Sequence, residues 1–349
     1  MTLLRTLRRQ GVRVLAPLVA ATALLSACGG GTSQVEAFKP DRLLVLGDEA
    51  SMLVDDGSFD GFKYGINDRR GTAEGKCLQL PNVAQAVANQ YNMRFAACNP
   101  RPVLSTTPPT FGERPVPSAF IHARLNAKVD DATTGLKAQI DGITNVGRTD
   151  MLLVMIGAND IIDLYAQKKA GTLTAAQAEA EATRRGGVAA AQINRILRTG
   201  ARALVITIPD MGKSPYAVTA NKTDTGAAAL MTTLSTEYNA ALRLGIDSTD
   251  FDGRNYGLVL ADDVTAAIAR FPGSFLSSPA NFTDAACNSA TPDTCVLTDS
   301  KDTTTLVDGA KNATAPTSAY LWATDRHLGP VALTQIANQA ISRAVNNPF

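Results

Sequence analysis

Four largely apolar runs predict buried β-strands. They cover 42–47, 151–156, 203–208 and 256–260. A run without alternation is typical of a strand that helices cover on both faces, as in a parallel sheet. Two of these runs stop abruptly at a glycine, the first at Gly47 and the second at Gly157. Because the chemistry of parallel sheets lies just beyond the carboxyl ends of the strands, these two stops are the first places to look for function.

Between these runs, apolar residues recur at helical spacing. The predicted helices cover 81–91, 136–143, 173–198 and 230–242, and a last one begins at Gly329-Pro330. Strand and helix alternate along the chain, which predicts an α/β fold: a single doubly wound, flavodoxin-like parallel sheet with right-handed crossovers.

The remaining stretches are predicted to be irregular. Residues 54–74 are polar and glycine-rich, and residues 272–319 are rich in Ser, Thr, Asp and Ala. The segment 102–117 holds five prolines and shows no period. We expect it to be a long surface loop near the mouth of a cleft, because such loops often shape sites at strand ends.

The N-terminus has the pattern of an export signal rather than of a fold. Arginines precede an apolar segment at 14–25, which is too short for a stable membrane span. It ends in Leu25-Ser26-Ala27-Cys28, which resembles the bacterial lipobox, in which the cysteine is lipidated. This predicts a signal peptide at 1–27, a tether at 28–40 and one domain at 41–349. An ordinary signal peptide with an incidental cysteine is the alternative.

Composition narrows the function classes further. The chain has 349 residues, a net charge of +1 and two histidines, His122 and His327. The low charge gives no support for nucleic-acid binding, and two histidines argue against a histidine-rich metal site. We therefore expect no metal, no cofactor and no nucleic-acid partner.

Four cysteines remain after Cys28: Cys77, Cys98, Cys287 and Cys295. An even number in an exported chain indicates disulfides, and three pairings are possible. The local pairing, Cys77–Cys98 with Cys287–Cys295, is favoured because each bond would close one short unit. Four buried thiols remain the alternative.

Polar clusters follow the strand ends at Gly47-Asp48-Glu49, at Gly157-Ala158-Asn159-Asp160 and at Pro209-Asp210, and Thr324-Asp325-Arg326-His327 precedes the last helix. Taken singly, each has a structural interpretation: Asp160 as a helix cap, Asp210 as a turn residue, His327 as a surface histidine. In a doubly wound sheet, however, strand-end clusters converge on one rim.

The order and spacing of these clusters resemble the SGNH, or GDSL, hydrolases, in particular the bacterial lipase and acylhydrolase branch. The best match is Val154-Met155-Ile156-Gly157-Ala158-Asn159-Asp160 to that family's Gly-x-Asn-Asp block. Ile208-Pro209-Asp210-Met211-Gly212 and Tyr238-Asn239 resemble further family segments. The resemblance covers about 41–347 and implies an ester hydrolase in which Asn159 holds the oxyanion and His327 is the general base.

Two positions depart from the family pattern. Glu49 stands where the nucleophilic serine belongs, and Thr324 stands where the family has the aspartate that orients the histidine. The glycine that supplies a further oxyanion donor has no clear match near 75–82.

Three interpretations stay open. The protein is still a hydrolase through Ser51 or through Glu49 as nucleophile, with Asp325 replacing Thr324. Alternatively, Glu49 and His327 form an ion pair in an inactive site, and the fold binds a ligand or partner. In the third, Glu49 activates water against an unusual substrate such as an acylated glycan. The expected partners are a small ester, a lipid or an acylated glycan, and a membrane through Cys28. The expected location is the outer membrane, facing the periplasm or the cell surface.

Overall fold

The computed structural model describes residues 37–55, 61–68, 76–288, 294–297 and 318–346. Residues 38–349 form one compact unit of the chain. The predicted signal peptide, Cys28 and most of the predicted tether lie outside the described residues.

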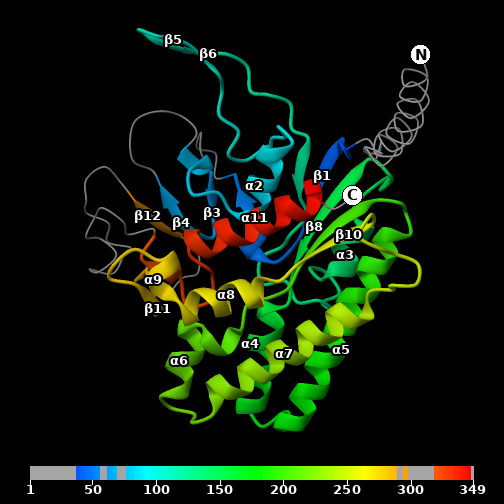
Figure 1. Cartoon of the computed structure of the whole chain (residues 1–349), viewed down its shortest axis with the longest axis vertical. Helices are drawn as coiled ribbons and strands as arrows, with labels where there is room; N and C mark the ends of the chain where they lie inside the picture. The colour runs from blue at the N-terminus through cyan, green and yellow to red at the C-terminus, as the bar shows by residue number, and fades with distance from the viewer. Residues whose placement is uncertain (1–36, 56–60, 69–75, 289–293, 298–317, 347–349) are drawn as a thin grey trace, which may run out of the picture. The chain divides into compact units, whose positions relative to one another are not determined.

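A five-stranded parallel sheet forms the centre of this unit, which confirms the predicted fold class (Figure 1). The strand order is β10-β9-β8-β1-β7, with every neighbouring pair parallel. The strands are β1 (Arg42–Gly47), β7 (Ala119–Ile121), β8 (Asp150–Met155), β9 (Arg202–Ile206) and β10 (Tyr256–Val259). Strand β7 was missed in the sequence because it has only three residues and its middle one, Phe120, is exposed.

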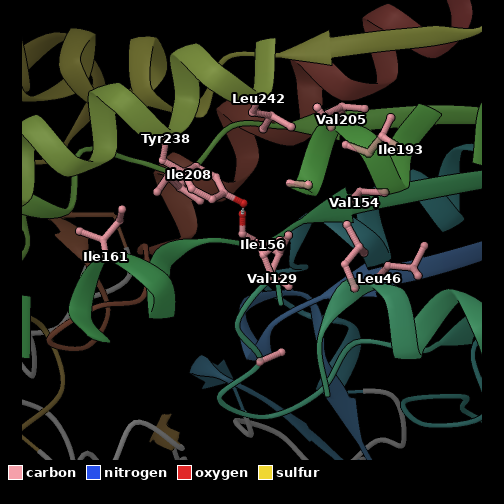
Figure 2. Packing of buried hydrophobic residues seen from close by; sticks show 14 of the residues in the cluster. Leu46, Val129, Val154, Ile156, Ile161, Ile193, Val205, Ile208, Tyr238 and Leu242 are labelled. Carbon is pink, nitrogen blue, oxygen red and sulfur yellow. Dashed lines mark hydrogen bonds between the residues drawn. The ribbon is translucent and has the colours of Figure 1, made fainter. Parts of the chain in front are cut away.

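Helices cover both faces of the sheet, as the continuous apolar runs required. One face carries α2 (Val83–Gln90), α8 (Ala261–Arg270) and α11 (Pro330–Asn346); the other carries α3 (Leu136–Asp141), α4 (Ala158–Lys169), α5 (Ala175–Leu197) and α7 (Ala227–Gly245). Along β1, Leu43 and Val45 face the first core, and Leu44 and Leu46 face the second. Figure 2 shows part of the second core, where Tyr238 of α7 donates a hydrogen bond to the carbonyl oxygen of Ile156 at 2.8 Å.

Helix starts follow local capping rules. Asn82 and Gln85 form a reciprocal capping box at α2, and Thr174 and Gln177 form another at α5. The shorter helices are α6 (Pro215–Asn221) and α9 (Pro272–Phe275), and each begins with a proline in its first turn.

Smaller paired strands occupy stretches that the sequence predicted to be irregular. They are β2 (Leu53–Val54) with β3 (Phe62–Lys63), β4 (Gly65–Asp68) with β12 (Thr294–Leu297), β11 (Asn281–Ala285) with β13 (Tyr320–Trp322), and β5 (Val103–Thr106) with β6 (Pro109–Phe111). The prediction of plain loops at 54–74 and 272–319 is therefore wrong for their described parts. Since β4 finds its partner more than 220 residues away, no local pattern could reveal it.

The segment 102–117 is also not where we expected it. Its hairpin, β5–β6, leads into Ala119, the first residue of β7, which runs parallel to β1. The segment therefore enters the sheet at the amino ends of the strands, whereas the predicted cleft lies at their carboxyl ends. Figure 1 shows the hairpin standing away from the sheet.

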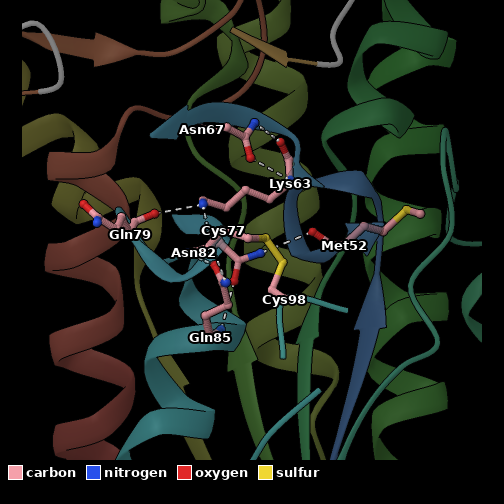
Figure 3. The surroundings of a disulfide bond; sticks show 8 residues. All are labelled: Met52, Lys63, Asn67, Cys77, Gln79, Asn82, Gln85 and Cys98. Atoms are coloured by element: carbon pink, nitrogen blue, oxygen red, sulfur yellow. Dashed lines mark hydrogen bonds between the residues drawn. A yellow bond between two sulfur atoms is a disulfide. The ribbon is translucent and has the colours of Figure 1, made fainter. Parts of the chain in front are cut away.

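The predicted Cys77–Cys98 disulfide is present and ties the short helix at 76–78 to the segment after α2, with Cα atoms 5.2 Å apart (Figure 3). Beside it, the buried Lys63 donates to the carbonyl oxygens of Cys77 and Gln79, both at 2.9 Å. Burial lowers the pKa of Lys63 to about 8. Cys287 is also disulfide-bonded. The side chain of Cys295 lies outside the described residues, so its pairing with Cys287 stays a prediction.

Candidate active site

The candidate site lies where the strand order reverses, at the carboxyl ends of β1 and β8. These two strands are neighbours, whereas the chain leaves β1 toward β7 on one side and β8 toward β9 on the other. Such a switch point opens a crevice between the loops that follow the two strands. Glu49 begins the short helix after β1, and Asn159 lies in the first turn of α4 after β8.

Two glycines make the sharp exits from these strands. Gly47 has φ of +137° and Gly157 has φ of +130°, a region that side chains rarely adopt. A Cβ at Gly47 would lie 1.8 Å from the carbonyl oxygen of Met155, and one at Gly157 would lie 2.5 Å from the Tyr238 ring. Gln139 also fixes Gly47, because its amide accepts from the Gly47 N–H and donates to the Gly47 carbonyl, both at 2.8 Å.

The Glu49 carboxylate is buried and receives hydrogen bonds from two directions. The backbone N–H of Asn126 donates to Oε2 at 2.8 Å. The Asn159 side-chain amide donates to Oε2 at 3.0 Å and to Oε1 at 3.2 Å. Thus the structure brings Glu49 and Asn159 together over 110 residues of sequence, and one carboxylate oxygen lies between two N–H donors.

Asn126 is a site residue that sequence reasoning missed. It follows β7, where the Arg124 N–H donates to the Gly47 carbonyl at 3.0 Å and holds this segment against the first strand exit. Asn126 itself has φ of +55°, which turns its N–H toward Glu49. Its contribution is a backbone group, so the only signal was the tolerance of asparagine for positive φ.

His327 completes the cluster from the segment before α11. Its Nε2 lies 3.5 Å from Oε1 of Glu49, longer than an ordinary hydrogen bond, and the ring is buried rather than at the surface. On the other side of the ring, Nδ1 lies 2.9 Å from the Thr324 hydroxyl. The Tyr64 ring lies beside the imidazole, with centroids 6.0 Å apart.

The Thr324 hydroxyl determines which imidazole nitrogen carries the proton. Its oxygen accepts from the backbone N–H groups of His327 at 3.0 Å and Arg326 at 3.3 Å. A hydroxyl has two lone pairs and one hydrogen, so the hydrogen is left to donate to Nδ1. A neutral His327 then carries its proton on Nε2, facing Glu49. A serine hydrolase needs the opposite tautomer, with Nδ1–H on a carboxylate and a free Nε2 toward the nucleophile.

Burial and charge act in opposite directions on the two neighbouring acids. Burial raises the pKa of Glu49, but the close contact with His327, the histidine charge and backbone N–H groups outweigh it, so the pKa lies below its ordinary value. Burial, followed by the nearby Glu49 charge, raises the pKa of Asp48 well above its ordinary value. Glu49 therefore holds the negative charge of this pair at neutral pH, and Asp48 binds its proton more tightly.

Little free space remains around the Glu49 carboxylate. The pocket there leaves about 20 Å³ for the centres of water-sized molecules, enough for about one water. Apolar side chains form much of the wall, from Met155, Ala158, Pro209, Leu328 and Leu333.

The other candidate residues lie apart from this cluster. The Asp325 carboxylate binds the Arg326 guanidinium at 2.9 and 3.0 Å and lines a different pocket, so Thr324 rather than Asp325 contacts Nδ1 of His327. Ser51 is buried, and it is not among the described residues that line the Glu49 pocket. Asp210 binds the N–H of Gly212 at 2.9 Å, as expected of a turn residue.

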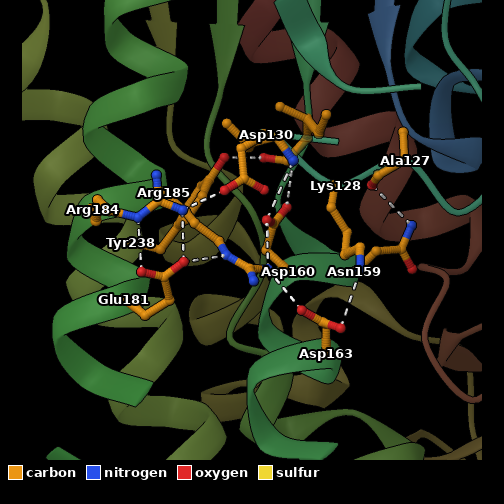
Figure 4. Close-up of polar contacts among 12 residues, drawn as sticks. Ala127, Lys128, Asp130, Asn159, Asp160, Asp163, Glu181, Arg184, Arg185 and Tyr238 are labelled. Atoms are coloured by element: carbon orange, nitrogen blue, oxygen red, sulfur yellow. Dashed lines mark hydrogen bonds and ion pairs between the residues drawn. The ribbon is translucent and has the colours of Figure 1, made fainter. Parts of the chain in front are cut away.

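Asp160 does not cap α4; it joins the first turn of α4 to the segment after β7 and to α5. Its carboxylate accepts from the Val129 N–H at 3.1 Å and pairs with Arg185 of α5 at 3.1 Å (Figure 4). Burial raises the pKa of Asp160 to about 7, although the Arg185 charge opposes this shift. Arg185 also binds Asp163 at 2.9 Å, so the first turn of α4, which carries Asn159, is joined to α5.

The described residues hold no cluster of three or more His, Cys, Asp or Glu side chains placed to bind a metal ion. None of the helices that the structure describes has the length and apolarity to cross a membrane.

Comparison with solved structures finds similar chains at low sequence identity. No protein-family model and no curated protein matches the chain. The chain is similar to LAE5, an alpha/beta hydrolase enzyme from the metagenome of Lake Arreo, Spain, with 13% identity, a TM-score of 0.41, and coverage of 90% of this chain and 99% of that one. It is also similar to Axe2, an acetylxylan esterase from Geobacillus stearothermophilus, with 13% identity, a TM-score of 0.40, and coverage of 88% and 95%. Likeness at this level concerns the arrangement of the chain alone.

Proposed function

We propose that this chain is an SGNH-type ester hydrolase in architecture and that its own Glu49 silences acyl transfer. The observation that carries the proposal is the position of the Glu49 carboxylate between the Asn126 N–H and the Asn159 amide. Two converging N–H donors in a buried pocket are the arrangement that stabilises an oxyanion during ester hydrolysis. Here they hold a permanent anion in place of the transient one.

This occupancy opposes catalysis in three ways. The carboxylate fills the space that an ester carbonyl would need. Its negative charge opposes the charge that develops on the substrate oxygen. The Thr324 hydroxyl also holds His327 with its proton toward Glu49, which removes the lone pair that a general base requires.

The same geometry argues against Glu49 as a working nucleophile or base. Both carboxylate oxygens accept hydrogen bonds, and the pKa of the group is lowered. A carboxylate of low pKa attacks poorly and takes a proton from water poorly. Moreover, its attack would consume the donors that must polarise the carbonyl group.

The apolar wall of the pocket supports short acyl groups as the substrates that the architecture would accept once opened. Small esters and acylated glycans carry such groups. We further propose that the protein is exported and anchored through a lipid on Cys28, at the outer membrane. The support for this anchor is the basic, apolar, Leu-Ser-Ala-Cys order at the N-terminus.

Replacing Glu49 with serine tests the silencing directly. The parent should show no turnover of chromogenic acetyl or butyryl esters above background. Glu49→Ser should hydrolyse them roughly 10³-fold faster than the uncatalysed reaction, the level that binding and oxyanion donors supply without a complete triad. A fluorophosphonate probe should label the variant at position 49 and leave the parent unlabelled.

Two controls separate the alternatives. Glu49→Ser combined with Asn159→Ala should lose most of the gain, because one oxyanion donor is worth about 10²–10³ in turnover. If the parent hydrolyses esters well and Glu49→Gln abolishes this activity, Glu49 is a working catalytic group and the proposal is wrong. Parent activity that survives Glu49→Gln, with probe labelling at Ser51, would also contradict it.

A further inference from the structure

The β5–β6 hairpin exposes apolar side chains that no part of the described chain covers. Leu104 is 71% exposed and Val103 is 52% exposed, and Val116 in the return segment is 88% exposed. Figure 1 shows the hairpin projecting away from the sheet and its helices. It is a two-stranded unit, with Val103 paired to Phe111 and Thr106 paired to Pro109.

The hairpin also lacks charge. Residues 102–112 contain no Asp, Glu, Lys or Arg, although nearly one residue in five of the whole chain is charged (19%). Charged residues resume at both ends, with Arg101 before the hairpin and Glu113 and Arg114 after it. Burying residues 102–112 would therefore desolvate no charged side chain of their own. The Arg101 guanidinium, which lies 4.8 Å from the Phe111 ring centroid, would have to stay among the headgroups.

The hairpin lies at the same end of the sheet as the start of the compact unit. It leads into the amino end of β7, which is parallel to β1. Phe38, near the start of the compact unit, packs under Arg202 at the amino end of β9, with the guanidinium carbon 4.1 Å from the ring centroid. Glu49 and His327 lie at the opposite, carboxyl end.

We propose that the hairpin docks into the surface of a lipid bilayer. The inference rests on the proposed anchor: Cys28 precedes Phe38 by 38 − 28 = 10 residues, which can span at most about 35 Å. A lipid on Cys28 would thus keep the amino end of the sheet close to the membrane. The uncharged hairpin at that end exposes apolar side chains that suit this surface.

The insertion is shallow. Among the described residues, each hairpin strand has one edge without a strand partner, and bare backbone N–H and C=O groups are costly in hydrocarbon. The headgroup region still supplies water to these groups while it accepts Leu104 and Val103. Docking at this end would direct the candidate site away from the bilayer.

A fluorescent label placed on the hairpin tests the docking. Residues 29–349 with an N-terminal hexahistidine are bound to vesicles of phosphatidylethanolamine and phosphatidylglycerol containing a nickel-chelating lipid, which replaces the natural anchor. A nitrobenzoxadiazole label is attached through Leu104→Cys, and through Phe282→Cys as a matched control in β11. The parent without an added cysteine, treated with the same reagent in the absence of reductant, gives the background labelling.

We expect a blue-shifted emission at position 104 that headgroup-level nitroxide lipids quench, and no change at position 282. With the label at Val116→Cys, the added change Leu104→Asp should reduce the emission shift to less than half of that seen for Val116→Cys alone. No shift at position 104 would overturn the inference, as would equal shifts at 104 and 282. A shift that appears without vesicles and grows with protein concentration would indicate pairing of two copies instead.

The anchor is tested separately by mass spectrometry of the processed chain. A lipid mass on Cys28 supports the premise. Its absence overturns the anchor and this inference while leaving the ester-hydrolase proposal untouched, because the Glu49→Ser assay does not depend on attachment.

Discussion

At the scale of single residues, the hydroxyl and the carboxylate beside the His327 imidazole occupy the opposite positions to those in a serine hydrolase. A serine hydrolase has its hydroxyl at Nε2 and its carboxylate at Nδ1. In this chain the carboxylate of Glu49 faces Nε2, and the hydroxyl of Thr324 binds Nδ1. The same three chemical groups are present, but the proton of His327 points the wrong way for base catalysis.

Restoring the acid at position 324 should therefore amplify the activity of Glu49→Ser. In the Glu49→Ser/Thr324→Asp chain, the new carboxylate accepts the proton on Nδ1 and frees Nε2. We expect turnover of short esters to rise by up to about 10⁴-fold over Glu49→Ser alone, since a misdirected tautomer costs about that much. Steady-state kinetics on both chains checks this. Thr324→Asn, which has a similar shape but no charge, should give no comparable rise; an equal rise would contradict the tautomer argument.

Glu49 should also contribute to stability in a pH-dependent way. Its pKa in the folded state is below the ordinary value of 4.5, so its stabilising contribution is complete above about pH 5 and is lost as the pH falls through the folded-state pKa. We expect the difference in melting temperature between the parent and Glu49→Gln to be constant from pH 7 to 5. Below pH 4.5 the difference should shrink. A difference that stays constant down to pH 3 would show that the carboxylate charge does not stabilise the fold.

The sequence was most informative for residues that act through their side chains. Glu49, Asn159 and His327 were found because they follow strand ends or precede the last helix at the family's spacing. Asn126 was missed because it contributes a backbone N–H, and its position depends on the path of the chain after β7. The pairing of Asp325 with Arg326 was also hidden, since both Thr324 and Asp325 precede His327 closely enough to contact it.

At the scale of elements, the exit from β8 requires glycine at position 157 for two reasons. Gly157 has a positive φ, and the Tyr238 ring also leaves no room for a side chain. The Tyr238 hydroxyl binds the Ile156 carbonyl, which fixes the ring against this turn. The start of α4, with Asn159, is therefore positioned by contact with α7.

Gly157→Ala should destabilise the protein by about 3 kcal/mol or more, because backbone strain and overpacking add. Gly171→Ala is the matched control: Gly171 also has a positive φ, of +76°, but a Cβ there would meet no atom within 4 Å. The control should lose only about 1 kcal/mol from strain. Urea unfolding monitored by circular dichroism measures both. Equal losses would mean that contact with Tyr238 is unimportant.

Long apolar elements were predictable, and short ones were not. Strands β1, β8 and β9 each contain at least four consecutive apolar residues, 43–46, 151–155 and 203–206, so the apolar pattern alone identified them. Strand β7 and the hairpin β5–β6 have three or four residues each and depend on pairing with distant or neighbouring segments. Because β7 was not predicted, the sequence did not show which end of the sheet the segment 102–117 approaches. The prediction that it lies at the mouth of the cleft is therefore wrong.

At the scale of the whole molecule, the two ends of the sheet differ in the side chains that they carry. The carboxyl end holds the polar cluster around Glu49, and the amino end receives the chain from Phe38 and carries the uncharged hairpin. A single attachment point before Phe38 would orient both ends at once.

Removing the proposed attachment should change the location of the protein without changing its fold. We expect Cys28→Ser to appear in the soluble fraction or as an unprocessed precursor, while the parent fractionates with membranes. Sucrose-gradient fractionation with immunodetection checks the outcome, and circular dichroism of the soluble form checks folding. A processed Cys28→Ser chain that still fractionates fully with the outer membrane would contradict the lipid anchor.

The side-chain carboxylate of Glu49 acts as a built-in ligand for its two N–H donors. Because it is covalently held beside its two N–H donors, it competes with dissolved anions as if present at a very high local concentration. Ligand screening of the parent by crystal soaking or thermal shift will therefore return few hits at this pocket, even if its walls are selective. Glu49→Gly would vacate the donors, and the small acids that then bind would reveal which acyl group these walls select.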